Sequence, residues 1–360
     1  MQVHELLSSL VPEGKAARWD PVGLQIGDPA AEVKSVAVCH EVTEVVVDRV
    51  VADPPDLLVT YHPLLFRPTT ALIAGTSPGG RALRLARAGV DLAVVHTAFD
   101  VAAGGAADAL AESVGVGSGR GFGPLEGPAG VKIVTFVPPA GVDEVFSAMS
   151  AAGAGRIGRY HGCSYRSEGV GTFNPSSRTS PWAGARGVLN EEPEVRLEMA
   201  VSAASADAVI AALVAAHPYE EPAYDLLSAR SNEGFVGRVG TLAEPVDLAS
   251  LARIVESKLD SGMVRIAGDQ DGPVSVVAVV PGSGGGLIGA AAAVGADVIV
   301  TGDVAHHQAV DALDRGIAVI DAGHAPTERP GMDRLYAAVA DLAVEARDLT
   351  KLNTNPWGRR

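Results

Sequence analysis

Short apolar runs alternate with helical segments twice along the chain, and this alternation limits the fold more than any other feature. Continuous Val, Ile and Leu strands separated by helices are typical of a buried, largely parallel sheet. The first region predicts strands at 33–40, 56–63 and 90–100, with helices at 41–52 and near 79–89. The second predicts strands in 273–286, 296–307 and 317–328, with helices at 287–295 and 309–316. The chain is therefore expected to be an α/β protein with two similar halves, and DLLVT (56–60) and DVIVT (297–301) occupy equivalent places in them.

A segment with a different pattern lies between the two halves. It begins after the glycine- and proline-rich stretch 117–130 and runs strand, helix, strand, strand, helix, strand. This order is typical of a ferredoxin-like α+β domain. We expect one core domain made of residues 1–124 and 236–360, and an inserted domain at 125–235, in which the loop 176–193 is exposed and mobile.

Composition and charge exclude several classes of protein. The net charge is −15, which argues against nucleic-acid binding, because contact with phosphates needs a clustered basic surface. The two cysteines, Cys39 and Cys163, form no CxxC pattern, so a disulfide framework or a thiolate zinc site is not expected. We see no signal peptide and no run of about 18 apolar residues, so we expect a cytoplasmic protein without a membrane span.

Histidines and carboxylates follow the ends of several predicted strands. Polar residues at the carboxyl ends of parallel strands line the ligand crevice of such sheets. Imidazole and carboxylate are the usual ligands of Zn, Fe, Mn or Co. The set with this chemistry comprises His62, His96, Asp100, His324 and Glu328.

Each of these residues also has an ordinary interpretation. A single histidine at a strand end is usually a surface residue or a satisfied core residue, and spacing in the sequence does not prove convergence in space. His96, His306 and His307 are candidates for proton transfer. The glycine loop 281–287 can either offer backbone N–H groups to an anion or serve only as a tight turn.

Several separated motifs occur along the core of the chain: DPVGLQIGD (20–28), YHPLLF (61–66), HTAFD (96–100), TGDVAHHQA (301–309) and DAGHAPTE (321–328). The inserted segment contains two more, RIGRYHGCSYRSEGVGTFNP (156–175) and AHPYEEPAYDL (216–226). With these motifs the chain resembles the longer members of the NIF-three-like family, also described as GTP cyclohydrolase type 2 homologues or dinuclear metal-centre hexameric proteins.

The resemblance implies a toroidal homohexamer with two metal ions in each subunit. His62 and Asp100 would hold one ion, His324 the second, and Glu328 would bridge both. The family usually has His-His-Pro where this chain has Tyr61-His62-Pro63, so a ligand of the second ion is replaced by a phenol. A phenol with a pKa near 10 is a poor ligand at neutral pH, so weak occupancy of the second position is expected.

Three functions are compatible with these observations. The first is a metal-dependent hydrolase of a nucleotide or other phosphorylated small molecule, with GTP suggested only by the family name. The second is a non-catalytic metal-binding scaffold or regulator, in which the inserted domain senses a small ligand. The third, a DNA-interacting protein, is disfavoured by the net charge of −15.

Overall fold

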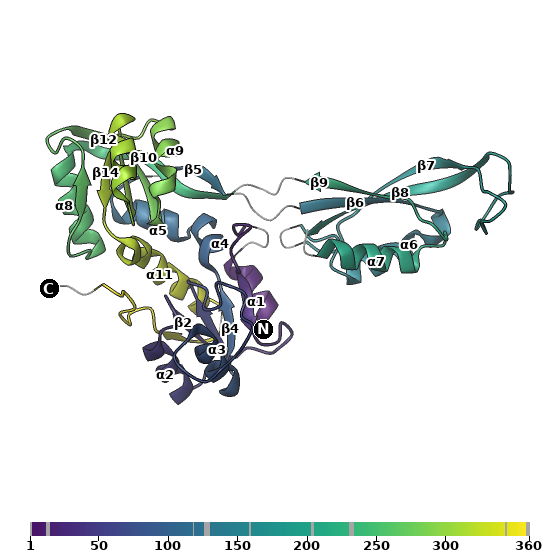
Figure 1. Ribbon diagram of the computed structural model, residues 1–360, viewed down its shortest axis with the longest axis horizontal. Helices are drawn as coiled ribbons and strands as arrows, with labels where there is room; N and C mark the ends of the chain where they lie inside the picture. The colour runs from purple at the N-terminus through teal and green to yellow at the C-terminus, as the bar shows by residue number, and fades with distance from the viewer. Residues whose placement is uncertain are drawn as a thin grey trace. The chain divides into compact units, whose positions relative to one another are not determined.

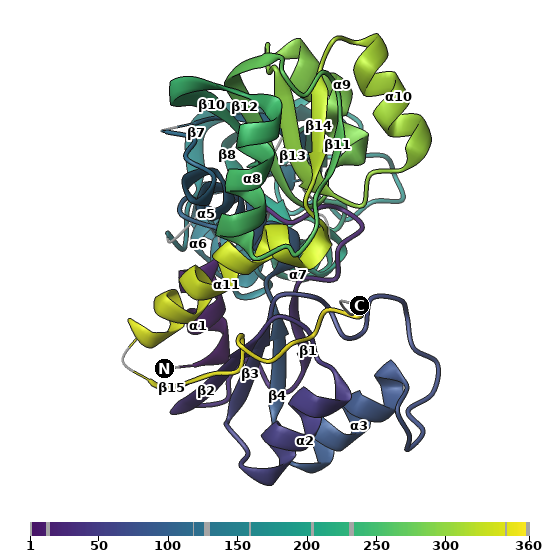
Figure 2. The same ribbon diagram turned by 90° about the vertical axis from the view of Figure 1, so that its left-hand side faces the viewer.

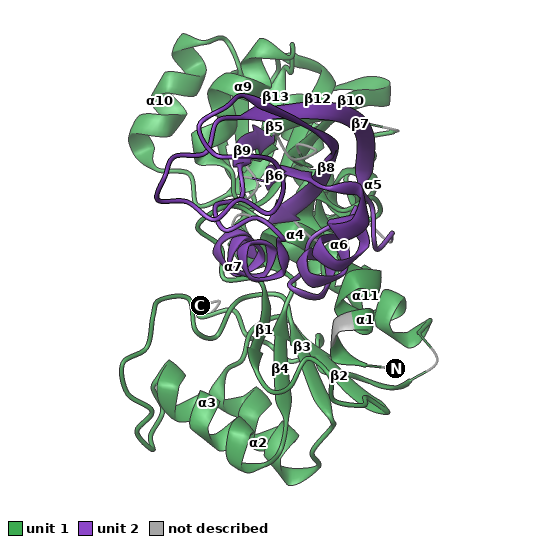
Figure 3. Cartoon of the chain, turned by 90° about the vertical axis from the view of Figure 1, so that its right-hand side faces the viewer, with its two compact units in different colours: residues 1–126, 233–360 green, residues 127–232 purple. Residues whose placement is uncertain are grey.

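The chain forms two compact units, which the computed structural model resolves in side-chain detail (Figure 3). Unit 1 consists of residues 1–126 and 233–360, and unit 2 consists of residues 127–232. The structure describes residues 2–11, 15–117, 119–125, 130–157, 160–202, 205–229, 234–342 and 344–357. None of the helices within these ranges has both the length and the apolar character that a membrane crossing requires.

The first half of unit 1 is a five-stranded sheet in the order β1-β4-β3-β2-β15 (Figure 2). Strands β15, β2, β3 and β4 run parallel, and β1 is antiparallel to β4. Strand β3 is buried at every position, and β2 and β4 are buried after their first residue, because helices cover both faces. The elements are β1 (Gly23–Ile26), β2 (Ser35–Cys39), α2 (Glu44–Ala52), β3 (Leu57–Thr60), α3 (Pro78–Arg87), β4 (Asp91–Val94) and β15 (Glu345–Asp348).

The second half of unit 1 is a six-stranded sheet in the order β11-β14-β13-β12-β10-β5. Strands β12, β13 and β14 run parallel, and β11, β10 and β5 are antiparallel to their neighbours. The elements are β5 (Arg120–Leu125), β10 (Gly234–Asp247), α8 (Leu248–Leu259), β11 (Arg265–Ala267), β12 (Pro273–Ser283), α9 (Ile288–Ala293), β13 (Val298–Gly302), α10 (His306–Asp314) and β14 (Ala318–Asp321).

The two halves repeat one another in detail, and the predicted α/β class is confirmed. The three parallel strands β2, β3 and β4 correspond to β12, β13 and β14, and each third strand has an antiparallel neighbour. Asp56 Oδ2 accepts hydrogen bonds from the backbone N–H groups of two consecutive residues, each at 2.8 Å. Asp297 Oδ2 does the same in the second half, also at 2.8 Å. The similarity of DLLVT (56–60) and DVIVT (297–301) therefore reflects equivalent places in the two halves. In each, the first aspartate binds the backbone at the start of the neighbouring strand.

Helix α11 (His324–Ala340) joins the two halves of unit 1. It packs against β2 and β15 of one sheet and against β12 and β13 of the other. Its apolar side chains Met332, Leu335 and Val339 lie in the same core cluster as the strand residues Val36 and Val38. The helices α1 (Val3–Leu10), α4 (His96–Val101) and α5 (Ala106–Ser113) complete this unit.

The predicted strand 90–100 is wrong in its second part. Strand β4 ends at Val94, and His96 begins α4. The side chain of Asp20 stops the strand, because its Oδ2 accepts hydrogen bonds from the backbone N–H and the hydroxyl of Thr97 in the first helical turn. His96 and Asp100 are therefore four residues apart in a helix and lie on the same side of it.

Unit 2 is a four-stranded antiparallel sheet in the order β7-β8-β6-β9, with α6 and α7 on one face (Figure 1). Its core consists of strand residues such as Ile133, Val137 and Leu197, packed against Val145 and Leu213 of the helices. Strand β8 begins at Asn190, inside the loop expected at 176–193. The elements follow the predicted order: β6 (Gly130–Val137), α6 (Val142–Ala151), β7 (Tyr165–Phe173), β8 (Asn190–Ser202), α7 (Ala206–Ala216) and β9 (Tyr224–Ala229).

Candidate metal centre

Two histidines and one glutamate meet at the carboxyl ends of the strands of unit 1. His40 directly follows β2, His62 lies two residues after β3, and Glu328 lies in the second turn of α11. Glu328 Oε2 is 2.9 Å from His40 Nε2 and 3.1 Å from His62 Nε2. One nitrogen or oxygen atom from each residue lies within 4.8 Å of the other two. Because each parallel strand ends at this edge, side chains far apart in the sequence converge here.

Glu328 is the central acid of this cluster. It is 2% exposed, and its second oxygen, Oε1, is 3.0 Å from His324 Nε2. Burial opposes the negative charge, but hydrogen bonds with His324, His40 and His62 outweigh burial and hold the pKa of Glu328 well below its ordinary value. Glu328 is therefore a carboxylate at neutral pH, with three imidazoles around it.

Two glycines allow the backbone to approach Glu328 and His324 closely. Gly282 has φ +65°, and a Cβ added there would lie 2.5 Å from Glu328 Oε1 and 3.3 Å from His324 Nε2. A Cβ added at Gly302 would lie 2.5 Å from the backbone nitrogen of His324. The glycine loop after β12 thus has a packing role, and its N–H groups at Gly282 and Gly284 donate to threonine hydroxyls of the same unit.

Asp303 orients His324. Its Oδ2 lies 2.7 Å from His324 Nδ1, and its backbone has φ 56°, a conformation that non-glycine residues rarely adopt. Burial lowers the pKa of His324, but the carboxylates of Glu328 and Asp303 outweigh burial and raise this pKa to about 9. Strained backbone of this kind persists where the surrounding structure holds a functional side chain in place.

A second acid, Asp100, lies beside the three-residue cluster. Burial raises the pKa of Asp100 to about 7, although a hydrogen bond from Tyr61 and the charge of His96 favour the ionised form. The Tyr61 hydroxyl donates to Asp100 Oδ1 at 2.5 Å. Burial and the nearby charges of Asp100 and Glu328 raise the pKa of Tyr61 well above 10. Tyr61 is therefore a protonated phenol that donates to Asp100.

His96 is held by Asp20. Its Nδ1 lies 2.9 Å from Asp20 Oδ2. Burial lowers the pKa of His96, but the hydrogen bond and charge of Asp20 outweigh burial, so the pKa is raised. The imidazole ring of His96 is 5.1 Å from that of His62 and 5.5 Å from the ring of Tyr61, measured between centroids. His96 therefore lies at the edge of the cluster, next to Asp100.

The structure brings together six of the eight site residues that the sequence predicts. His62, His324 and Glu328 contact one another, and Asp100, Tyr61 and His96 lie beside them. His306 and His307 begin α10 and are exposed. In the described part of the chain, neither forms a hydrogen bond or ion pair with a member of the cluster. A role for these two residues stays a prediction.

His40, Asp20 and Asp303 are the site residues that the sequence analysis did not select. The rule that identified His62 applies equally to His40, since it directly follows the strand predicted at 33–40. Asp20 had no such signal, because it precedes β1 and reaches His96 only through the tertiary fold. Asp303 lies at the exit of the strand predicted at 296–307, but only the tertiary fold shows that it orients His324.

The residues present fit a divalent ion. Two imidazole nitrogens and a carboxylate oxygen form a donor set that suits Zn, Fe, Mn or Co. Two of the neighbouring histidines have a partner at the other ring nitrogen, as is typical of metal ligands: His40 Nδ1 is 3.0 Å from the hydroxyl of Thr354, and His324 Nδ1 is 2.7 Å from Asp303 Oδ2. His324 contacts the Glu328 carboxylate, and Asp100 lies close enough to Glu328 and His62 to interact with their charges. Both residues could therefore extend the donor set.

A large pocket adjoins the cluster through His40. Its volume is about 960 Å³, and the start of α11 and the C-terminal residues 350–355 form most of its wall. Two cations in the wall are paired with acids, Arg329 with Asp260 and Lys351 with Asp333. A pocket of this volume is large enough for a ligand of nucleotide size.

Comparison with known proteins places this chain in a family. A GTP cyclohydrolase 1 type 2 homolog from Bacillus subtilis is 37% identical over 326 residues, which are 90% of this chain and 87% of that protein. The homolog of the same name from Mycobacterium tuberculosis is 38% identical over an alignment of 367 positions, which covers 99% of this chain and 95% of that protein.

The crystal structure of a Bacillus cereus protein related to NIF3 is similar to this chain with a TM-score of 0.65 and 34% identity, covering 100% of this chain and 99% of that one. Residues 1–356 match the family described as Duf34/NIF3 (NGG1p interacting factor 3). With this match, and with relatives of more than 30% identity along most of its length, the chain belongs to the Duf34/NIF3 family.

Proposed function

We propose that this protein is a metal-dependent hydrolase of a nucleotide or another phosphorylated small molecule. The observation that carries the proposal is the buried carboxylate of Glu328, whose Oε2 lies within hydrogen-bond distance of both His40 and His62. The relatives named GTP cyclohydrolase 1 type 2 homolog support hydrolytic chemistry through their name alone.

His40, His62 and Glu328 would hold the ion, and His324 and Asp100 would complete its surroundings. A divalent ion bound there would supply Lewis-acid activation of water near neutral pH. Residues of the chain itself position the groups that surround the ion. Tyr61 keeps the Asp100 carboxyl in place through its hydroxyl, and Gly282, which has no Cβ, leaves room for Glu328 Oε1.

His96 has the geometry of a proton carrier. With Nδ1 bound to Asp20, the tautomer that donates from Nδ1 leaves Nε2 as an acceptor. In the described ranges no protein group hydrogen bonds to this second nitrogen. A substrate hydroxyl or water beside the cluster could therefore transfer a proton to His96 Nε2, and later receive it back.

The pocket next to His40 supports a substrate of nucleotide size. It holds about 960 Å³, and its wall includes the side chains of Arg329 and Lys351. Both cations are paired with aspartates, so an anionic substrate would compete with Asp260 and Asp333 for them. GTP is one member of this substrate class, suggested by the names of the relatives.

The test is turnover of a nucleotide panel by the metal-loaded chain. Release of formate or phosphate would be measured with Mn, Fe or Zn added, for the native chain and for Glu328→Gln. We expect turnover that the substitution lowers by about 100-fold or more, as is typical when a metal ligand is lost. Absence of turnover across the panel, in protein shown to contain metal, would contradict the proposal.

A non-catalytic metal-binding scaffold or regulator is the second candidate. The hydrogen bond from Tyr61 to Asp100 favours it, because Asp100 is engaged by a phenol rather than free to bind an ion. Metal bound without turnover, together with a metal-dependent change in assembly, would support this function over the first.

We further propose a toroidal homohexamer with one or two ions in each subunit. The support is the resemblance to dinuclear, hexameric members of the family, in which the ions face an internal cavity. Light scattering coupled to size-exclusion chromatography tests it, since a hexamer of this 36.7 kDa chain differs sixfold in mass from a monomer.

A further inference from the structure

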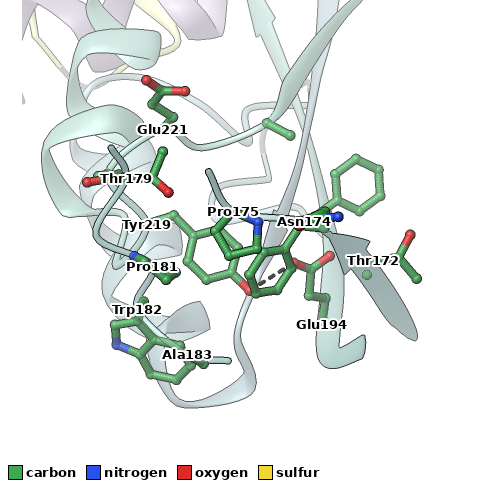
Figure 4. A pocket seen from close by; sticks show the side chains of 15 residues that line it. Thr172, Asn174, Pro175, Thr179, Pro181, Trp182, Ala183, Glu194, Tyr219 and Glu221 are labelled. Atoms are coloured by element: carbon green, nitrogen blue, oxygen red, sulfur yellow. Dashed lines mark hydrogen bonds between the residues drawn. The ribbon is translucent and has the colours of Figure 1, made fainter. Parts of the chain in front are cut away.

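Unit 2 carries a cavity of its own, apart from the residues of the metal centre (Figure 4). Its volume is about 330 Å³. Phe136 of β6 and Glu194 of β8 form part of it, whereas their sequence neighbours Val137 and Val195 pack in the core with α6 and α7. Because side chains alternate between the faces of a sheet, the cavity lies on the face that the helices leave uncovered.

Aromatic rings form much of the wall of this cavity. Phe136 and Phe173 come from the sheet, Trp182 from the loop between β7 and β8, and Tyr219 from the turn after α7. Figure 4 shows the rings of Trp182 and Tyr219 near one another, and their centroids are 6.2 Å apart. Trp182 is 53% exposed, an unusual environment for so large an apolar side chain.

A glutamate is fixed among these rings. Glu194 Oε1 accepts a hydrogen bond of 2.9 Å from the Tyr219 hydroxyl. Burial and the Glu194 carboxylate raise the pKa of Tyr219, so its hydroxyl remains a donor. A Cβ added at Gly171 would lie 2.2 Å from Glu194 Oε2, so the glycine leaves room for this second oxygen.

The loop that closes the cavity is anchored to the turn on its other side. The backbone N–H of Ser180 donates to Glu220 Oε1 at 2.9 Å. Glu221 also lines the cavity, so three carboxylates border it. Among the described residues that form its wall, none is Lys, Arg or His. An anion would therefore find no cationic side chain in this wall, while a cation would find carboxylates and aromatic faces together.

We propose that this cavity of unit 2 binds a small organic cation, with an ammonium or guanidinium group placed between the Glu194 carboxylate and the rings of Trp182 and Tyr219. The faces of Trp and Tyr attract cations, and quaternary ammonium groups are recognised by such aromatic walls. The cavity is within the range of volumes that enclose small ligands. A hydrated metal ion would leave the aromatic walls unused, and an apolar molecule would leave Glu194 without a positive partner.

Calorimetric titration of the full-length protein tests the proposal with three probes. Choline carries a quaternary ammonium, agmatine carries a guanidinium, and 3,3-dimethylbutan-1-ol is the uncharged isostere of choline. We expect saturable binding of choline or agmatine, and binding of the uncharged alcohol weaker by about tenfold or more.

Two variants assign the site. Glu194→Gln keeps the acceptor for the Tyr219 hydroxyl but removes the charge, and we expect about tenfold weaker cation binding. Trp182→Ala removes a half-exposed ring without disturbing the core of unit 2, and we expect a similar loss. Glu191→Gln changes an exposed glutamate of the same strand that does not line the cavity, and should bind the cations as the native chain does.

Three results would overturn the proposal. In the first, 3,3-dimethylbutan-1-ol binds as tightly as choline. In the second, neither choline nor agmatine saturates the protein at millimolar concentration. In the third, Glu191→Gln loses as much cation affinity as Glu194→Gln. Saturation by Ca²⁺ or Mg²⁺ alone, with no response to either organic cation, would equally exclude it and indicate a metal site.

Discussion

The imidazole of His40 lies 2.9 Å from the carboxylate of Glu328, although 288 residues separate them in the chain. His40 directly follows β2 of the first sheet, and Glu328 lies in α11, the helix that follows β14 of the second. The contact forms because α11 packs against strands of both sheets. The candidate metal centre therefore depends on the joining of two halves, neither of which contains it alone.

Replacing His40 by alanine should remove most of the metal affinity. His40 Nε2 is one of three donor atoms that lie within 4.8 Å of one another, so its loss leaves only His62 and Glu328. We expect a decrease of at least 10- to 100-fold in affinity, measured by titration with Zn or Mn and by metal analysis. His161→Ala, an exposed histidine of unit 2, is the matched control. Unchanged metal content in His40→Ala would remove it from the ligand set.

Tyr61→His should increase the number of ions held per subunit. The native phenol donates to Asp100 and stays protonated, so it cannot bind a metal ion as a neutral imidazole nitrogen does. We expect the native chain to retain one ion tightly and the variant to retain a second. Tyr61→Phe serves as control, because it removes the hydroxyl without adding a ligand. Two tightly held ions in the native chain, found by metal analysis, would show the reasoning to be wrong.

Gly282→Ala should destabilise the site and the fold together. The backbone of Gly282 has φ +65°, and a Cβ there would come within 2.5 Å of Glu328 Oε1. We expect the free energy of unfolding to decrease by about 1–3 kcal/mol, with weaker metal binding. Gly286→Ala, where an added Cβ meets nothing within 4 Å, should stay close to native in urea denaturation. Equal stability of the two variants would count against close packing at Gly282.

The stability of unit 2 should decrease when the pH falls below about 6.5. Burial lowers the pKa of His217 from 6.5, although the hydrogen bond to the carbonyl of Phe136 favours the charged form. Its Nδ1 accepts the backbone N–H of Tyr219, which requires the unprotonated nitrogen. Below pH 6.5 the unfolded chain binds a proton that the folded chain does not, so this contribution is complete above that pH and is lost as the pH falls.

Amide hydrogen exchange in β6 and β8, corrected for the intrinsic effect of pH, measures this dependence. His217→Gln should show a weaker dependence between pH 7.5 and 5.5, because the titrating group is absent. An identical pH dependence in the native chain and the variant would assign the effect to other groups.

The sequence by itself determined the repeated α/β halves, the order of elements in the segment between them and five of the acids and imidazoles at the site. These properties depend on local pattern: apolar runs predict buried strands, and the carboxyl ends of parallel strands meet at one edge. For this reason five side chains could be identified before their positions were known: His62, His96, Asp100, His324 and Glu328. The motifs around them indicated the family that the comparisons confirm.

Only the tertiary structure decided the partner of each side chain. Pattern alone could not show that Asp20 ends the strand before His96, that Tyr61 donates to Asp100, or that His40 shares Glu328 with His62. Each of these contacts joins segments that the chain brings together through packing of α4 and α11 between the sheets. Distances of that kind depend on the whole core, because no local preference of the chain encodes them.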